Sequence, residues 1–218
     1  MIAHAAMVFV IDDDAPVRKS LKRLLDAADY QVELFESAAD FLARPPFQGP
    51  SCVIVDVRMP GLSGIDLQKT LVQRHRQEQL VFLTGHGDIP ICVQAMKAGA
   101  VDFLPKPFES KNLLDCVERA LARSNEQRRQ AAEKNSARRS LDLLTPREFE
   151  VMQLLTTGML NKQVGGELGI AEKTVKCHRG HLMHKLGVCS IAELIGLVQK
   201  AEVPLVSLVS DQSRIAFR

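Results

Sequence analysis

Short apolar runs that alternate with amphipathic stretches constrain the first half of this chain more than any other feature of its sequence. Strands that alternate with helices pair in parallel, and the helices then cover both faces of the sheet. The sequence therefore predicts an α/β domain with a doubly wound sheet of five parallel strands. The strands are expected at residues 7–11, 31–35, 52–55, 80–83 and 101–104, and the helices at 15–28, 37–43, 64–73, 89–98 and from about 109.

Chemically active side chains stand where these strands end. Asp12 and Asp13 follow the first strand, Asp56 the third, Thr84 closes the fourth, and Lys106 follows the fifth. In such sheets the site lies outside the carboxyl ends of the strands. Carboxylates gathered there repel one another unless a cation joins them, and oxygen ligands at this density suit Mg²⁺. A lone Asp at a strand end would mark only a turn or a cap, but this combination predicts a Mg²⁺ site.

Charge and cysteine content describe the chain as a whole. Residues 1–120 carry a net charge of −3 and residues 121–218 a net charge of +5, which suggests an anionic partner for the second part or a chance spread of solvated charge. The five cysteines form no CxxC pair, so we predict a reducing cytoplasmic location without a disulfide or zinc framework. Residues 1–11 are interpreted as a leading strand and not a signal peptide, and we expect no membrane partner.

Helix start and stop signals define an all-α domain of four helices at residues 141–203. The second and third helices are joined through Gly169, Ile170 and Ala171, a spacing typical of a helix-turn-helix. Residues 123–140 are polar and lack Gly and Pro, which predicts a helical linker, whereas the tail at 204–218 either docks on the helical domain or frays. The helices are expected from the capping box at Thr145 and Glu148 to Gly158, from a cap at Asn161 to Gly169, at 172–186, and from a capping box at Ser190 and Glu193.

The third of these helices has an apolar face and a face with lysines beside small residues. Such a face can approach the major groove of DNA, and the first turn can hold phosphates through free backbone N–H groups. We expect Val175, His178, Leu182 and Leu186 to face the core. The candidate DNA-contacting residues are Lys173, Thr174, Lys176, Cys177, Arg179, Gly180 and His184.

Four ordered motifs in residues 7–120 resemble those of a receiver domain: VFVIDDD, VIVDVRMPGLSG, VFLTGHGDIP and AMKAGAVDFLPKPF. The resemblance implies a flavodoxin-like fold in which Asp56 accepts a phosphoryl group from a phosphohistidine of a cognate histidine kinase. It implies that Mg²⁺ binds Asp13, Asp56 and the backbone carbonyl of Arg58, assisted by Asp12. It also implies that the Lys106–Pro107 peptide bond is cis, which would direct Lys106 toward the site. Thr84 and Phe103 resemble the switch residues of the family, although Phe103 is equally well explained as core.

Residues 141–203 resemble the LuxR/GerE-type DNA-binding domain through LTPREFEVMQLLTTGMLNKQVGGELGIAEKTVKCHRGHLMHKLGV. With the receiver in front, the order resembles the NarL/FixJ family of transcriptional regulators, which implies a regulator and not an enzyme. Three departures matter. Ala171 stands where the family prefers a Ser cap, Gly165 and Gly166 interrupt a helix, and Gly180 replaces a longer side chain.

The predicted organisation is a receiver at 1–122, a helical linker at 123–140, a DNA-binding domain at 141–203 and a tail at 204–218. Phosphorylation of Asp56 is expected to release the DNA-binding domain and to favour a homodimer through the face formed by 89–98, 101–104 and the helix from 109. The dimer would bind paired promoter half-sites and, as a further partner, RNA polymerase. Two alternatives stay open: a phosphate sink or interaction module whose helical domain does not grip DNA, and a phosphoesterase.

Overall fold

The computed structural model describes residues 6–85 and 89–203. Two compact units make up the chain, a first unit at residues 1–129 and a second unit at residues 130–218. Three predicted features fall partly or wholly outside the described residues: the start of the leading strand, the loop after the fourth strand, and the tail.

The first unit holds the predicted five-stranded parallel sheet. Its strands are β1 (Met7–Ile11), β2 (Gln31–Phe35), β3 (Ser51–Asp56), β4 (Gln79–Thr84) and β5 (Asp102–Pro105), in the order β2-β1-β3-β4-β5. Neighbouring strands pair in parallel, with Val10 opposite Ile54 and Asp56 opposite Leu83. This order is that of the flavodoxin-like fold, whose site lies where the order reverses, beside β1 and β3.

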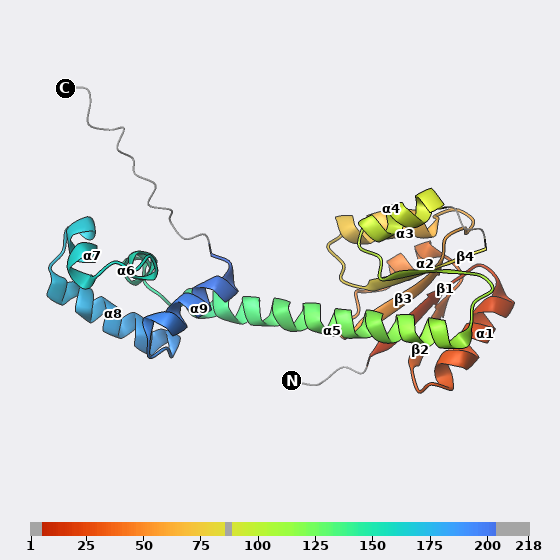
Figure 1. Ribbon diagram of the computed structural model, residues 1–218, viewed down its shortest axis with the longest axis horizontal. Coiled ribbons are helices and arrows are strands. Elements are labelled where there is room, and N and C mark those ends of the chain that lie inside the picture. Colours follow the sequence, from red (N-terminus) through yellow and green to blue (C-terminus); the bar gives the residue numbers. More distant parts are fainter. Residues whose placement is uncertain (1–5, 86–88, 204–218) are drawn as a thin grey trace, which may run out of the picture. The chain divides into compact units, whose positions relative to one another are not determined.

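Helices cover both faces of the sheet (Figure 1). The helices α1 (Ala15–Asp26) and α5 (Ser110–Leu141) pack on one face, where Leu21, Leu25, Leu113 and Val117 meet the strands. The other face carries the helices α2 (Ala38–Ala43), α3 (Gly64–Gln73) and α4 (Ile89–Lys97).

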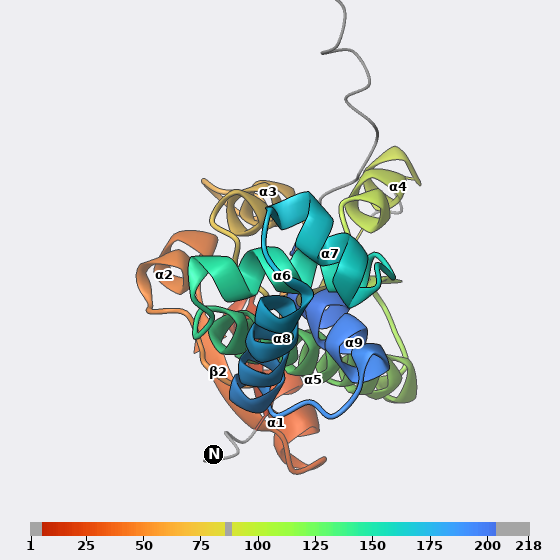
Figure 2. The same cartoon turned by 90° about the vertical axis from the view of Figure 1, so that its left-hand side faces the viewer.

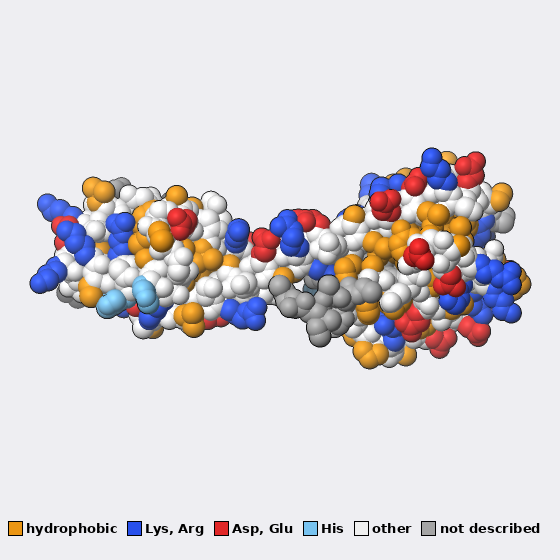
Figure 3. Space-filling view, turned by 90° about the horizontal axis from the view of Figure 1, so that it is seen from below, with side chains coloured by type: hydrophobic (Ala, Val, Ile, Leu, Met, Phe, Trp, Pro, Cys, Tyr) orange, Lys and Arg blue, Asp and Glu red, His pale blue; other side chains and the backbone are white. Residues whose placement is uncertain are grey.

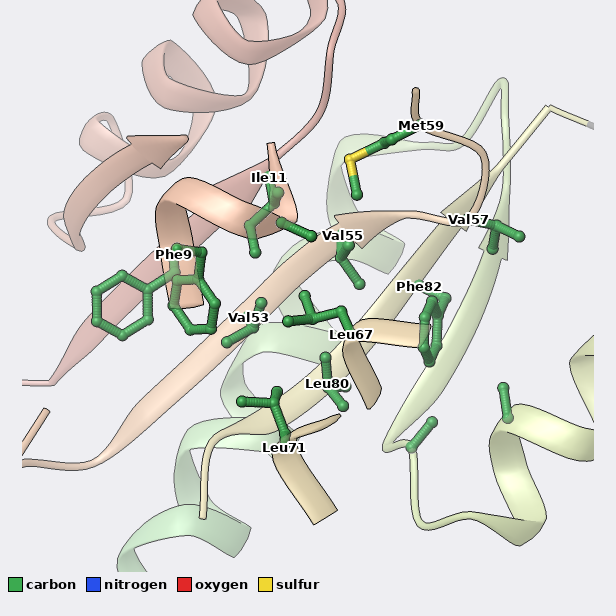
Figure 4. Close-up of a cluster of buried hydrophobic side chains, with 14 residues drawn as sticks. Phe9, Ile11, Val53, Val55, Val57, Met59, Leu67, Leu71, Leu80 and Phe82 are labelled. Atoms are coloured by element: carbon green, nitrogen blue, oxygen red, sulfur yellow. The ribbon is translucent and has the colours of Figure 1, made fainter. Parts of the chain in front are cut away.

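The core under α2, α3 and α4 is built mainly from aromatic and branched side chains. Figure 4 shows Phe9, Val53 and Phe82 of the sheet beside Leu67 and Leu71 of α3. Alternate residues of each strand point to opposite faces, so Val53 and Val55 enter this core while Cys52 and Ile54 enter the other. Burial on both faces explains why these strands are continuous apolar runs.

The helix α5 is one continuous helix from Ser110 to Leu141, which confirms that residues 123–140 are helical. Its middle stays on the first unit, because the Ser124 hydroxyl accepts the backbone N–H of Ser51 at 3.0 Å. Gln127 accepts a hydrogen bond from the Gln79 side chain at 2.8 Å. The sequence did not predict these contacts, which place residues up to Arg129 with the first unit.

The last turns of α5 belong to the second unit. Ala137 and Leu141 are buried in its core, and the Arg138 Nε donates to the backbone oxygen of Ala201 at 2.9 Å. Residues 123–140 therefore do not act as a single separate segment, because each end packs on its own unit.

The second unit is a helical bundle formed around the end of α5 by α6 (Pro146–Thr156), α7 (Asn161–Leu168), α8 (Glu172–Leu186) and α9 (Ile191–Ala201). The helix α8 contacts both α6 and α7, and α9 contacts α6, an arrangement seen end-on in Figure 2. Val151, Val164, Val175, Leu182 and Leu194 fill the centre of the bundle and are fully buried.

The helix boundaries follow the capping signals, with one correction. The capping box between Thr145 and Glu148 is formed, and Ser190 caps α9. The prediction that Asn161 caps α7 is wrong, because Asn161 is already helical and Leu160 is the cap residue. The Gln163 side chain accepts the Leu160 N–H at 2.8 Å, which is one half of a capping box, while Leu160 has no side-chain oxygen to supply the other half.

All five cysteines are free thiols, and Cys177 and Cys189 are exposed. Within the described residues, no single helix has the length and apolar character to cross a membrane, while the bent pair of Glu172–Leu186 and Ile191–Ala201 meets that test by length and composition only.

Candidate phosphorylation site and DNA-binding face

Three predicted site residues meet at the carboxyl edge of the sheet. The Lys106 ammonium donates to Asp12 Oδ2 at 2.7 Å and to Asp56 Oδ1 at 2.6 Å. Asp12 follows the last residue of β1, and Asp56 is the last residue of β3. Because β1 and β3 are neighbours in the sheet, the two carboxylates lie close together. The Lys106–Pro107 peptide is cis, as predicted. The lysine is thus the cation that joins the two acids.

The surroundings of Lys106 keep it charged. Partial burial alone would lower the pKa of Lys106, but its hydrogen bonds to Asp12 and Asp56 outweigh this effect and hold the pKa above its usual value. Two carboxylates around one ammonium leave a net negative charge at the edge. The edge can therefore accept a further cation.

The loop after β3 holds the Asp56 carboxylate in place. The backbone N–H of Arg58 donates to Asp56 Oδ2 at 2.7 Å, so both carboxylate oxygens of Asp56 have partners. Gly64, at the start of α3, lies so close that a Cβ atom there would stand 2.4 Å from the Asp56 backbone oxygen. Gly64 was not predicted as a site residue, and its signal in the sequence is a glycine in the first turn of the helix that follows the strand.

Asp12 is held by Arg18, which was not predicted from the sequence. Arg18 is buried on α1 and donates from Nη1 to the Asp12 backbone oxygen at 2.6 Å and from Nη2 to Glu36 at 2.7 Å. The Asp14 N–H donates to Asp12 Oδ1 at 2.9 Å, and Asp14 is the cap residue of α1. Asp14 thus positions the loop and the start of α1.

Thr84 and Phe103 lie on the same face of the sheet. Phe82 pairs with Phe103 across β4 and β5, and Thr84 follows Phe82 by two residues, so their side chains share one side. The Phe82 and Phe103 rings lie 6.0 Å apart between centroids. Thr84 is buried, whereas Phe103 is only half-buried. This geometry agrees with a switch pair and also with Phe103 as part of the core.

Fewer acidic residues are placed to bind Mg²⁺ than the sequence suggested. The described residues contain no group of three Asp, Glu, His or Cys side chains placed to hold one metal ion, and Asp13 is exposed. The expected convergence of three carboxylates is therefore not present. Mg²⁺ needs only one or two carboxylates because it keeps several waters. The adjacent Asp12 and Asp56 carboxylates meet that smaller requirement.

Six of the seven candidate DNA-contacting residues lie on the exposed face of α8, and Arg179 does not. Lys173, Thr174, Lys176, Cys177, Gly180 and His184 are all exposed, while Arg179 is half-buried and its guanidinium lies 3.5 Å from Asn161 Oδ1. Val175 and Leu182 are buried on the opposite side, and His178 and Leu186 are half-buried. Lysine and arginine side chains gather on the surface of the second unit in Figure 3.

The turn between α7 and α8 explains one of the two adjacent glycines. A Cβ atom at Gly165 would lie 2.7 Å from the Ile170 backbone oxygen, whereas nothing lies within 4 Å of the corresponding position at Gly166. Gly165 permits close approach within the turn, and Gly166 has no such role. At the start of α8, Ala171 makes no side-chain cap, as predicted.

Comparisons with known proteins agree with both units. Residues 8–118 match the family described as response regulator receiver domain, and residues 142–198 match bacterial regulatory proteins of the luxR family. The chain is 45% identical over 190 residues to nodulation protein W of Bradyrhizobium diazoefficiens, covering 87% of this chain and 84% of that protein. It is 40% identical to the transcriptional regulatory protein FixJ of the same organism, covering 89% and 95% of the two chains.

A solved structure covers the same length. The response regulator StyR superposes with a TM-score of 0.78 at 49% identity, over 90% of this chain and all of that chain. Fold, site and comparisons together define a response regulator with a receiver domain and a LuxR-type DNA-binding domain.

The chain belongs to the NarL/FixJ family of two-component response regulators. It is a DNA-binding transcriptional regulator, and the first and second units are the receiver and the DNA-binding domain, respectively. Receiver domains generally bind Mg²⁺ at their phosphorylation site, and the family implies a cognate histidine kinase.

Proposed function

We propose that Asp56 accepts a phosphoryl group and that this modification controls DNA binding by α8. The observation that carries the proposal is the Lys106 ammonium that bridges Asp12 and Asp56 at the open edge of the sheet. A carboxylate oxygen of Asp56 attacks phosphorus and displaces the histidine nitrogen of the kinase, forming an acyl phosphate. Lys106 neutralises the charge on the transferring group, a task of positioning and electrostatics.

Mg²⁺ would be held by the Asp12 and Asp56 carboxylates together with the backbone carbonyl of Arg58, with Asp13 contributing through water. Its charge would offset that of the phosphoryl oxygens. Asp13 adjoins Asp12 and is exposed, so it stands at the solvent side, where water completes the coordination of the ion. Asp12 and Asp56 form the inner part of this set.

A groove beside Lys106 supports docking of the kinase. It has a volume of 350 Å³ and lies between α1 and the loop that follows β5. Its lining is mostly apolar, which fits the apolar face of a partner helix that presents the phosphohistidine to Asp56. The lining residues are Val17, Ser20, Leu21, Leu24, Lys106, Pro107, Phe108 and Ser110.

Phosphorylation would change the partners of Lys106 and Thr84. The new group brings roughly −1.5 to −2 charges and strong acceptor oxygens. The Thr84 hydroxyl donates to one of them and moves toward Asp56, and the Phe103 ring turns into the space that Thr84 leaves. The change biases an equilibrium between two receiver states, for which a coupling of a few kcal/mol is enough.

The surface next to this pair supports a phosphorylation-dependent homodimer. Ile89, Val93 and Met96 are exposed along α4 at helical spacing, with 74%, 46% and 41% of their surface open. Exposed apolar patches mark interaction surfaces, and a second copy of the receiver would cover this row. The dimer, formed through α4, β5 and α5, would bring two α8 helices to half-sites about one DNA turn apart. Contact with RNA polymerase then follows at the promoter, and the protein acts in the cytoplasm, where its DNA lies.

Selection of genomic DNA fragments by the purified protein tests this proposal. Selection is run with and without beryllofluoride and Mg²⁺ at one fixed salt concentration, because phosphate contacts make affinity depend on salt. We expect enrichment of fragments that share a paired motif only with the phosphoryl mimic. Equal enrichment in both conditions contradicts control by the receiver. Enrichment in neither favours the phosphate-sink or interaction-module alternative.

A further inference from the structure

A groove in the second unit has no role in phosphorylation or in the DNA-binding face. It has a volume of 570 Å³ and lies where the end of α5 and the start of α6 meet the end of α9. Leu141, Leu144, Phe149 and Val203 give it an apolar floor, and charged side chains stand on its rim. The described residues that line it are Arg138, Leu141, Asp142, Leu144, Pro146, Phe149, Glu202 and Val203.

The chain itself arrives at this groove as α9 ends. The C-cap residue of α9 is Glu202, which adopts a left-handed backbone conformation with φ of 48° and donates its N–H to the Gln199 oxygen at 3.1 Å. This residue turns the chain, and both Glu202 and Val203 line the groove. The next residue of the sequence is Pro204.

The residues that follow have the composition of a segment that becomes buried. Residues 204–209 read PLVSLV, in which Ser207 is the one polar residue, and the sequence then turns polar. An extended chain advances at most ~3.6 Å per residue, so Leu205 and Val206 remain within about 11 Å of Val203. A segment tethered this closely has an effective concentration in about the millimolar range. A separate partner would have to compete with the segment at that concentration.

We propose that the C-terminal segment, residues 204–209, occupies this groove. Leu205 and Val206 then pack on Leu144 and Phe149, which are half-buried. The segment also covers the contact between Arg138 and the Ala201 carbonyl that fastens the end of α5 to α9. In this position the segment adds apolar contacts where α5 meets α9.

A single tryptophan tests the proposal directly, because the chain has no tryptophan of its own. In full-length Leu205→Trp we expect blue-shifted emission and several-fold weaker quenching by acrylamide than in the matched control Gln212→Trp, which lies in the polar part of the tail. Equal emission maxima and equal quenching of the two variants overturn the proposal.

A groove variant identifies the place of burial. Adding Leu144→Glu to Leu205→Trp is expected to move emission to the red and to restore quenching, with helical content checked by circular dichroism. Blue emission that persists there means the segment is buried elsewhere, which contradicts the proposal. Since Leu144→Glu can weaken the fold, a chain ending at Val203 supplies a second readout: the second unit should melt at a lower temperature than in the full chain, and an unchanged Tm counts against docking.

Two measurements distinguish docking of the segment in its own groove from docking on a second copy or on the receiver. They are the emission of Leu205→Trp at different protein concentrations and its emission with and without beryllofluoride. Intramolecular docking gives Leu205→Trp emission that is independent of protein concentration and unaffected by beryllofluoride. Emission that becomes blue only at high concentration assigns the segment to a second copy of the chain, and emission that changes with beryllofluoride assigns it to the receiver. Either result overturns the proposal and leaves phosphorylation of Asp56 and DNA binding untouched.

Discussion

Each unit of the protein contains a lysine bound to buried carboxylates, and the two clusters have similar distances but different consequences. In the receiver, Lys106 lies 2.6 and 2.7 Å from Asp56 and Asp12. In the DNA-binding domain, Lys185 lies 2.7 Å from Glu148. A short ion pair therefore does not by itself indicate a functional site.

The difference lies in what else each carboxylate binds. The Glu148 carboxylate accepts hydrogen bonds from the Lys185 ammonium and from the backbone N–H and hydroxyl of Thr145. These partners complete a helix cap. Asp56 shares Lys106 with Asp12, and the three groups carry a net negative charge at a sheet edge. The first cluster is satisfied and stabilises the fold, whereas the second is the site at which we propose that a phosphoryl group and a cation bind.

The largest expected effect is the loss of phosphorylation in Asp56→Asn. The amide of Asn cannot form an acyl phosphate, so incorporation of labelled phosphoryl groups from the cognate kinase or a small acyl phosphate should be abolished. The second unit should melt at its usual temperature. Label that persists on this variant would show that Asp56 is not the acceptor.

DNA affinity should respond next, through the exposed lysine at the start of α8. Lys173→Ala removes a cation that binds phosphate, so we expect affinity to weaken about tenfold and the slope of log affinity against log salt to fall by about one. Fluorescence anisotropy of a selected DNA fragment across a salt series measures both. Lys19→Ala, an exposed lysine on α1, is the matched control and should leave both values unchanged.

Glu148→Gln should have the opposite effects to Asp56→Asn: it should lower the stability of the second unit and leave phosphorylation intact. The amide keeps the shape of the cap but loses the charge opposite Lys185, and we expect the second unit to lose about 1 kcal/mol of stability at pH 7, since Lys185 is partly exposed. Phosphoryl transfer to Asp56 should be unchanged. Urea unfolding of the second unit and labelling of Asp56 measure the two effects separately, and loss of labelling would contradict the division of roles.

The same cluster predicts a dependence on pH. Hydrogen bonds from Lys185 and Thr145 lower the pKa of Glu148 from 4.5 to about 2. A carboxyl whose folded pKa is lowered stabilises the fold above its unfolded pKa, and this contribution is lost as pH falls from about 4.5 toward 2. The stability difference between the natural chain and Glu148→Gln should therefore shrink over that range. A difference that stays constant down to pH 2 would exclude the charge of Glu148 as its source.

The smallest expected effect separates the two adjacent glycines of α7. Gly166→Ala should stabilise the second unit by up to about 1 kcal/mol, because nothing obstructs a Cβ atom there. Gly165→Ala should gain less or lose stability, because its Cβ meets the Ile170 oxygen and the turn must shift. Thermal unfolding of the two variants in parallel tests the order, and greater stability of Gly165→Ala would contradict the packing argument.

The sequence predicted what depends on periodicity and on strand order. Apolar runs located all five strands within a residue or two, and the rule for parallel sheets brought Asp12, Asp56 and Lys106 to one edge. Capping signals located the helices of the second unit except at α7, where the cap residue is Leu160 and the Gln163 side chain accepts its N–H. These features are local, or follow from one topological rule.

Contacts between distant segments could not be predicted in this way. Arg18 reaches the Asp12 backbone, Gly64 permits the approach of the Asp56 carbonyl, and Ser124 fastens α5 to β3. Each depends on the direction of one side chain, or on its absence, in the folded molecule. The position of Asp13 is of the same kind, because adjacent residues at a strand end can point toward the site or into solvent.

The central claim is that the state of Asp56 sets the DNA affinity of the second unit. The most direct test is the affinity of the full-length protein for a selected paired site, measured at one salt concentration with and without beryllofluoride and Mg²⁺, in the natural chain and in Asp56→Asn. Couplings of this kind are typically about 5- to 150-fold. We predict a gain within that range for the natural chain and none for Asp56→Asn. Equal affinity of the natural chain in both conditions would contradict the claim.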